Sequence, residues 1–188
     1  MYKCLKWPIH KIDNYSLIPV RDIDKLFIME WRNAQLDILR QEKLLTIQDQ
    51  ENYFSNTVLP LFSQPFPRQL LFSFLVNDLL IGYGGLVHIH WNDKRAEVSF
   101  LLDNKRAKDD RIYEKEFSIY LTLIKQIAFK DLEFNRLYTE TFDIRPHHIS
   151  VLEKNGFELE GRMKKHVIIG DVMYDSLIHG YLKEYENI

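Results

Sequence analysis

Several short segments rich in apolar residues have the pattern of β-strands, and in residues 95–102 and 136–142 alternate side chains also define two distinct faces. These segments are residues 15–20, 70–76, 80–90, 95–102 and 136–142, followed by two more on either side of residues 170–171. Asn77-Asp78, Asn92-Asp93 and Gly170-Asp171 have the composition of tight turns. The pattern therefore predicts an antiparallel meander over residues 70–102 and a long hairpin near the C-terminus.

Two segments in the first half of the chain show the three- to four-residue apolar spacing of amphipathic helices. The first follows Asp22 or Asp24, either of which can cap a helix, and the second follows a capping box of Thr46 and Asp49. We expect the buried stripes of these two helices to consist of Ile23, Phe27 and Trp31, and of Ile47, Phe54, Val58 and Leu61.

Two further helices are predicted in the second half. One spans residues 113–132, with Phe117, Leu121, Ile124 and Ala128 on one side. Because it crosses over between strands 95–102 and 136–142, these strands should be parallel neighbours. The other is short: it begins at Pro146, stops at Gly156, and has apolar residues at Ile149, Leu152 and, beyond the stop, Phe157.

These elements predict one domain over residues 1–188 with a mixed α+β fold. We expect a central, mostly antiparallel sheet of about seven strands with helices on both faces. The length suits one domain, and 46% hydrophobic and 28% charged residues are typical of a soluble globular protein.

Composition excludes several classes of function. A formal net charge of -2 provides no basic field for a phosphate backbone, so we expect no nucleic-acid partner. Cys4 is the only cysteine, and no Cys/His cluster has zinc spacing, so neither a disulfide nor a metal is expected. Residues 79–91 form the longest apolar stretch, which is too short to span a membrane, and the N-terminus lacks a signal peptide's apolar core. We expect a cytoplasmic protein without membrane contact.

The most specific motif is VLEKNGFELEG at residues 151–161, which follows a strand and a short helix. It resembles the GNAT superfamily of acetyl-CoA-dependent N-acetyltransferases, and most of all the branch with the ribosomal-protein N-terminal acetyltransferases. Residues 80–86 and 96–102 resemble the family's third and fourth strands. Trp31-Arg32-Asn33 resembles the first helix of this branch and of enzymes that acetylate nucleotide-linked amino sugars. The resemblance extends over about residues 15–185.

The resemblance implies direct transfer of an acetyl group from acetyl-CoA, as co-substrate, to a primary amine in a ternary complex. The pantetheine would lie where the two parallel strands splay apart, and the free backbone amides of Phe100, Leu101 and Leu102 would pair with it and with the thioester carbonyl. A protein N-terminal amine and an amino sugar both stay open as acceptor. The acceptor pocket would include Trp31, Arg32, Asn33, Tyr83 and Glu140. Such folds often pair through sheet edges or terminal strands, so a homodimer is also an expectation.

The pyrophosphate cradle departs from the family pattern. The family's glycine-rich loop lets backbone amides approach the pyrophosphate, whereas residues 103–116 contain no glycine. The glycine positions are taken by Tyr113, Glu114 and Lys115, so cationic side chains such as Arg106 and Arg111 would have to bind the phosphates in place of amides. The alternatives are a solvated loop of no consequence and, for the whole chain, a non-catalytic GNAT-fold binding or regulatory module.

Three residues are candidates for proton transfer. Glu97 and Glu140, on neighbouring strands, compete for the role of base, and an ion pair is the alternative for Glu97. At the start of the short helix, Arg145 and His148 take the positions of the branch's Asn and Ser, so the resemblance implies that His148 helps to bind the co-substrate and protonates the leaving thiolate. The alternative for His148 is a structural helix cap.

Overall fold

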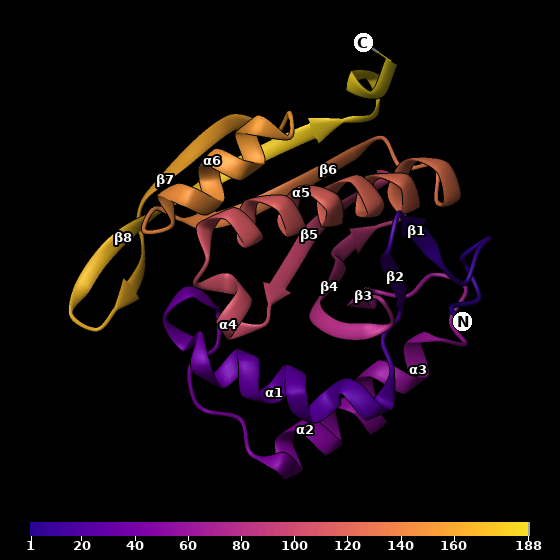
Figure 1. Cartoon of the computed structure of the whole chain (residues 1–188). Helices are drawn as coiled ribbons and strands as arrows, with labels where there is room; N and C mark the ends of the chain where they lie inside the picture. Colours follow the sequence, from indigo (N-terminus) through magenta and orange to yellow (C-terminus); the bar gives the residue numbers. More distant parts are fainter. Residues whose placement is uncertain (188) are drawn as a thin grey trace.

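A single sheet with helices on both faces organises the chain, as Figure 1 shows for the computed structural model, which describes residues 1–187. The strand order is β1-β2-β3-β4-β5-β6-β8-β7. The strands are β1 (His10–Ile12), β2 (Tyr15–Pro19), β3 (Leu70–Val76), β4 (Leu79–His90), β5 (Arg95–Leu102), β6 (Arg136–Phe142), β7 (Glu158–Ile169) and β8 (Val172–Leu182). All neighbours are antiparallel except β5 and β6, which are parallel as predicted.

The helices are α1 (Lys25–Ala34), α2 (Ile47–Tyr53), α3 (Leu59–Leu61), α4 (Asn104–Ala107), α5 (Asp110–Gln126) and α6 (Pro146–Lys154). The π-helical segments Phe54–Val58 and Ile127–Asp131 extend α2 and α5, and 3-10 turns lie at Asp22–Asp24, Leu36–Ile38 and Lys183–Asn187. Thr46 and Asp49 form the predicted capping box of α2. Gly156 (φ +85°) ends α6 and Gly170 (φ +60°) forms the β7–β8 turn, both in the left-handed region that favours glycine.

The sheet separates two apolar clusters. One lies beneath α5 and α6, which run along the same face in Figure 1, and contains Phe117, Tyr120 and Leu152 among its buried residues. The other lies between the opposite face and α1–α2, and contains Trp31 and Tyr83. The predicted placement of helices on both faces is therefore confirmed.

Two of the three residues predicted for the buried stripe of α1 are wrong, and only Trp31 is buried as predicted. Ile23 is 76% exposed and Phe27 is 54% exposed, whereas Asp24 and Ile28 are buried together with Trp31. Asp24 is drawn inward because Ser73 Oγ donates to its carboxylate at 2.6 Å and Arg21 forms an ion pair with it. The 3-10 turn before α1 therefore places the next position of the pattern against the sheet.

Two smaller expectations also need correction. Ile47, the first residue of α2, is 60% exposed. In α6 the buried residues are His148, Val151 and Leu152, while Ile149 is only partly buried. The sheet of about seven strands is confirmed: it has eight, because the three-residue β1, too short to show a period, also pairs with β2.

The parallel pair β5–β6 opens after a short region of contact. Only three pairs are in register: Arg95 with Arg136, Ala96 with Leu137, and Glu97 with Tyr138. Both strands continue past this point, to Leu102 and Phe142, without further pairing. The predicted splay is therefore present, and it leaves a wedge between the two strands.

Candidate active site

The wedge between β5 and β6 contains a cavity of about 190 Å³. Its walls come from both strands, from Phe117 on α5, from Arg145 and His148 at the start of α6, and from the segment 38–40 that follows α1. A second cavity of about 280 Å³ adjoins it at the N-termini of α5 and α6 and shares Ile38, Arg145 and His148 with the first. A continuous lining thus connects the inside of the wedge with the ends of two helices.

Backbone amides of β5 face this wedge at alternate positions. Asp103, the residue after β5, donates its amide to the Ile81 carbonyl at 2.8 Å, and residues 97–102 pair continuously with β4. Because amides point alternately to the two sides of a strand, the amide of Leu101 faces β4, whereas the amides of Phe100 and Leu102 face the wedge. Leu101 is therefore a correction to the predicted set of three free amides.

The two candidate bases are brought together by an arginine that the sequence did not indicate. Arg40 Nη2 lies 2.8 Å from Glu97 Oε1 and 3.1 Å from Glu140 Oε2. Glu97 also lies 2.7 Å from His88 Nδ1, and Glu140 lies 3.6 Å from His166 Nε2. Both carboxylates line the cavity, and both are engaged in ion pairs there.

His148 belongs to a buried network at the start of α6. Its Nδ1 lies 2.6 Å from Tyr113 Oη, which accepts a hydrogen bond from Arg145 at 3.2 Å. Burial lowers the pKa of His148 well below its usual value, and the nearby Arg145, His179 and His147 lower it further. Burial also raises the pKa of Tyr113, so the phenol keeps its proton near neutral pH.

These contacts allow one consistent arrangement of protons on the two rings. Arginine can only donate, so Tyr113 accepts from Arg145 and can donate its own proton to His148 Nδ1. In that arrangement the neutral imidazole carries its proton on Nε2. His148 is therefore a neutral hydrogen-bond donor near pH 7 rather than an imidazolium acid, which changes the role that its position implied.

Thr139 on β6 is a further polar group of the wedge. It lines the cavity and is 3% exposed, and within the described part of the chain its hydroxyl has no hydrogen-bond partner. A buried hydroxyl without a partner is costly, so this atom favours a polar ligand in the wedge. Together with the amides of Phe100 and Leu102, it fits the amide-bearing pantetheine arm of an acyl-CoA.

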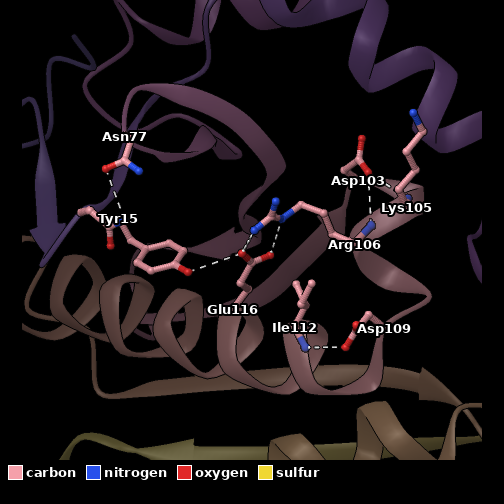
Figure 2. A network of polar contacts seen from close by, with 9 residues as sticks. Tyr15, Asn77, Asp103, Lys105, Arg106, Asp109, Ile112 and Glu116 are labelled. Carbon is pink, nitrogen blue, oxygen red and sulfur yellow. Dashed lines mark hydrogen bonds and ion pairs between the residues drawn. The ribbon is translucent and has the colours of Figure 1, made fainter.

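The predicted pyrophosphate loop is engaged in contacts of its own. Figure 2 shows the Arg106 guanidinium facing the carboxylate of buried Glu116, with Nε donating at 2.8 Å, and the Tyr15 hydroxyl pointing to the same carboxylate. Asp109 caps α5 by accepting from the amides of Arg111 and Ile112, each at 3.0 Å. The amides at the start of α5 and one of the two predicted cations, Arg106, are therefore occupied within the chain, so this region fits the phosphates less well than the wedge fits the pantetheine.

The other residues predicted for this loop lie at different depths. Tyr113 lines the second cavity, whereas Glu114 forms an ion pair of 2.7 Å with Lys154 and Lys115 lies over the Tyr15 ring. Arg111 is exposed to solvent. Of the three residues at the family's glycine positions, only Tyr113 reaches the site.

Of the predicted acceptor residues, some line the wedge cavity and others do not. Arg32 lines the wedge cavity and donates to Gln41 at 3.0 Å. Asn33 instead holds the loop after α1, through reciprocal 2.8 Å hydrogen bonds with the backbone of Leu45. Trp31 and Tyr83 are core residues, each 6% exposed, and line none of the described cavities, so they are corrections.

Sequence reasoning missed four residues of the site: Arg40, His88, Phe117 as a cavity wall, and Thr139. Thr139 could have been found, because it alternates with Glu140 on a strand already assigned to the wedge. Arg40 carries no local signal, because its contacts lie 57 and 100 residues away along the chain.

Two kinds of feature are absent from residues 1–187, the part of the chain that the structure describes. There, no cluster of three or more His, Cys, Asp or Glu side chains is arranged to hold a metal ion. No helix of that range combines the length and the apolar character that crossing a bilayer requires.

Comparison with solved structures shows the same fold. A chimera of spermidine N-acetyltransferase SpeG from Vibrio cholerae and hSSAT has a TM-score of 0.78 at 16% identity, covering 94% of this chain and 100% of that one. The Vibrio cholerae spermidine N-acetyltransferase in complex with CoA and spermine gives 0.78 at 16% identity, covering 91% and 96%. RimL, a ribosomal L7/L12 alpha-N-protein acetyltransferase in complex with coenzyme A, gives 0.74 at 14% identity, covering 93% and 97%.

Sequence comparison identifies the family. A search of curated proteins found no matching relative. Residues 19–178, however, match the family model of the acetyltransferase (GNAT) domain, which is most of the chain. The chain therefore belongs to the GNAT acetyltransferase family.

Proposed function

We propose that this protein is an N-acetyltransferase that transfers the acetyl group of acetyl-CoA directly to a primary amine in a ternary complex. The observation that carries the proposal is the wedge between β5 and β6, in which amides of one strand, a buried hydroxyl of the other and two carboxylates line one cavity. The co-substrate would supply the activated acetyl group and a sulfur leaving group.

Each residue of the wedge then has a chemical task. Glu97 or Glu140 takes a proton from the acceptor ammonium, so that the nitrogen can attack as a free amine. The amides of Phe100 and Leu102 donate to the carbonyl oxygen as negative charge develops on it. His148 donates a hydrogen bond to the departing sulfur, and the sulfur takes the proton that the nitrogen loses once the C–N bond has formed.

The acceptor is a protein N-terminal amine or an amino sugar, and the structural neighbours suggest a polyamine as a third class to include. RimL is an acetyltransferase of a ribosomal protein, and the Vibrio cholerae enzyme is a spermidine acetyltransferase that was solved in complex with spermine. A panel that follows CoA release with N-terminal peptides, UDP-linked amino sugars and spermidine separates these classes.

Replacing the carboxylates tests the mechanism. We expect Glu97→Gln or Glu140→Gln to lower kcat by roughly 100-fold to 10,000-fold on the best acceptor of the panel, since general-base catalysis contributes about that much. Glu30→Gln, an exposed carboxylate on α1, is the matched control and should retain wild-type kcat. Full turnover in the double variant Glu97→Gln, Glu140→Gln would rule out carboxylate catalysis.

A non-catalytic binding or regulatory module is the second candidate, because Asp109 already occupies the helix amides that would bind a pyrophosphate. Thermal unfolding in the presence of acetyl-CoA discriminates between the two, since a ligand that binds the folded state raises its stability. No shift in melting temperature together with no CoA release on any acceptor would favour the module.

A further inference from the structure

We propose that Arg40 occupies the place of the acceptor's ammonium group, and that the acceptor binds as a cation between Glu97 and Glu140 once Arg40 has withdrawn. This inference rests on the proposed function and names the group that its acceptor site recognises. It also makes Arg40 an internal competitor of the substrate.

The positions of the three side chains support this assignment. Glu97 and Glu140 stand on the sheet strands β5 and β6, and their side chains are 9% and 18% exposed. Arg40 is 43% exposed and belongs to the connection between the 3-10 turn Leu36–Ile38 and α2. The anionic half of the contact thus stands on sheet strands and is largely shielded from solvent, whereas the cationic half reaches in from a surface loop.

The geometry of the contact suits an amine nitrogen. One nitrogen, Arg40 Nη2, lies within 3.1 Å of an oxygen of each carboxylate. An ammonium group at that point could donate to both carboxylates and retain a third proton. Because two partly buried carboxylates are costly without a cation, the free protein needs a resident cation, and a substrate ammonium can take over this role.

The other charged groups of the cavity are already partnered. Arg145 donates to Tyr113, and Arg32 donates to Gln41. His88 and His166 approach Glu97 and Glu140 from the rim. Among the three arginines that line the cavity, Arg40 alone is placed between the carboxylates.

The replacement also places the reacting nitrogen beside its bases. One carboxylate accepts an N–H proton from the bound ammonium, which leaves the nitrogen with a lone pair, while the other stays ionised. The lone pair forms the C–N bond to the acetyl carbonyl carbon as the C–S bond breaks. The sulfur keeps the bond's electrons and takes the proton that the nitrogen then loses, so the products are the amide and the thiol.

Calorimetric titration of spermidine into the protein without acetyl-CoA tests the inference independently of turnover. We expect Arg40→Ala and Arg40→Gln to bind spermidine at least 10-fold more tightly than the wild type, and Arg40→Lys to bind it as weakly as the wild type. Lys43→Ala, an exposed cation of the same loop, is the matched control and should leave the affinity unchanged. Octane-1,8-diol, an uncharged chain of similar length, should show no gain with any variant.

Several outcomes would overturn the inference. Unchanged or weaker spermidine binding in both Arg40→Ala and Arg40→Gln, with melting temperatures showing that they fold, would mean that Arg40 does not compete with a cation. The same conclusion would follow if the gain persisted after adding Glu97→Gln and Glu140→Gln. If either of these results is obtained while acetyl-CoA still raises the melting temperature of the wild type, only this inference fails. If acetyl-CoA does not bind to the wild type at all, the proposed function itself is contradicted.

Discussion

His148 is buried among aromatic rings, and this determines its chemistry. Its ring stacks on Phe117 with the centroids 4.5 Å apart, and its Nδ1 lies against Tyr113. Loss of hydration disfavours the charged imidazole, which is why its pKa falls well below the usual value. At the residue scale, packing keeps the side chain of the expected acid neutral near pH 7.

This burial predicts a pH dependence of stability. In the unfolded chain His148 binds a proton below about pH 6.5, whereas the folded chain, with its lowered pKa, does not. The free energy of unfolding should therefore fall as the pH drops from 6.5 toward the folded pKa, by at most about 1.4 kcal/mol per pH unit for this one proton. Urea unfolding at pH 7.5 and 5.5 measures the loss.

A variant isolates the contribution of His148. Burial lowers the pKa of His10 as well, but His10 contributes to the wild type and to His148→Gln alike. The loss between pH 7.5 and 5.5 should be smaller in His148→Gln than in the wild type, while the exposed His90→Gln should behave as the wild type. Equal losses of unfolding free energy in the wild type and in His148→Gln would contradict the lowered pKa of His148 in the folded protein.

At the scale of elements, α6 places His148 and ends at Gly156, whose φ of +85° favours glycine. A Cβ there would also lie 3.0 Å from Tyr181 Cε2. We expect Gly156→Ala to lower the free energy of unfolding by about 1 to 2 kcal/mol. Gly161→Ala, where a Cβ would have no neighbour within 4 Å, is the control and should change stability little. Similar effects of the two changes in urea unfolding would contradict this account.

Sequence patterns predicted the secondary-structure elements more accurately than they predicted the contacts between side chains. The period of two gave β5 and β6 their observed bounds, and the capping box placed the start of α2, because these signals are local. The stripe of α1 was wrong because burial of Asp24 depends on Ser73 in a distant strand. The loop cations were placed by charge alone, and the partner of Arg106, Glu116, could not be identified without the fold.

At the scale of the whole molecule, the site results from an interruption of the sheet. β5 and β6 pair over three residues and then diverge, so one parallel pair provides both the rigid base of the wedge and its open end. The long β7–β8 hairpin extends away from the body of the molecule in Figure 1 and exposes Ile168, Val172 and Met173. The expected homodimer, for which this hairpin offers an apolar surface, stays a prediction.

Hydrogen exchange at three consecutive amides tests the wedge most directly. In the free protein, the amide of Leu101 should exchange slowly because it faces β4, whereas those of Phe100 and Leu102 should exchange faster. Saturating acetyl-CoA should slow exchange at Phe100 and Leu102 and leave Leu101 nearly unchanged, as NMR spectra of the labelled protein would show. Unaltered exchange at Phe100 and Leu102 with acetyl-CoA bound would contradict the claim that the co-substrate lies in the wedge.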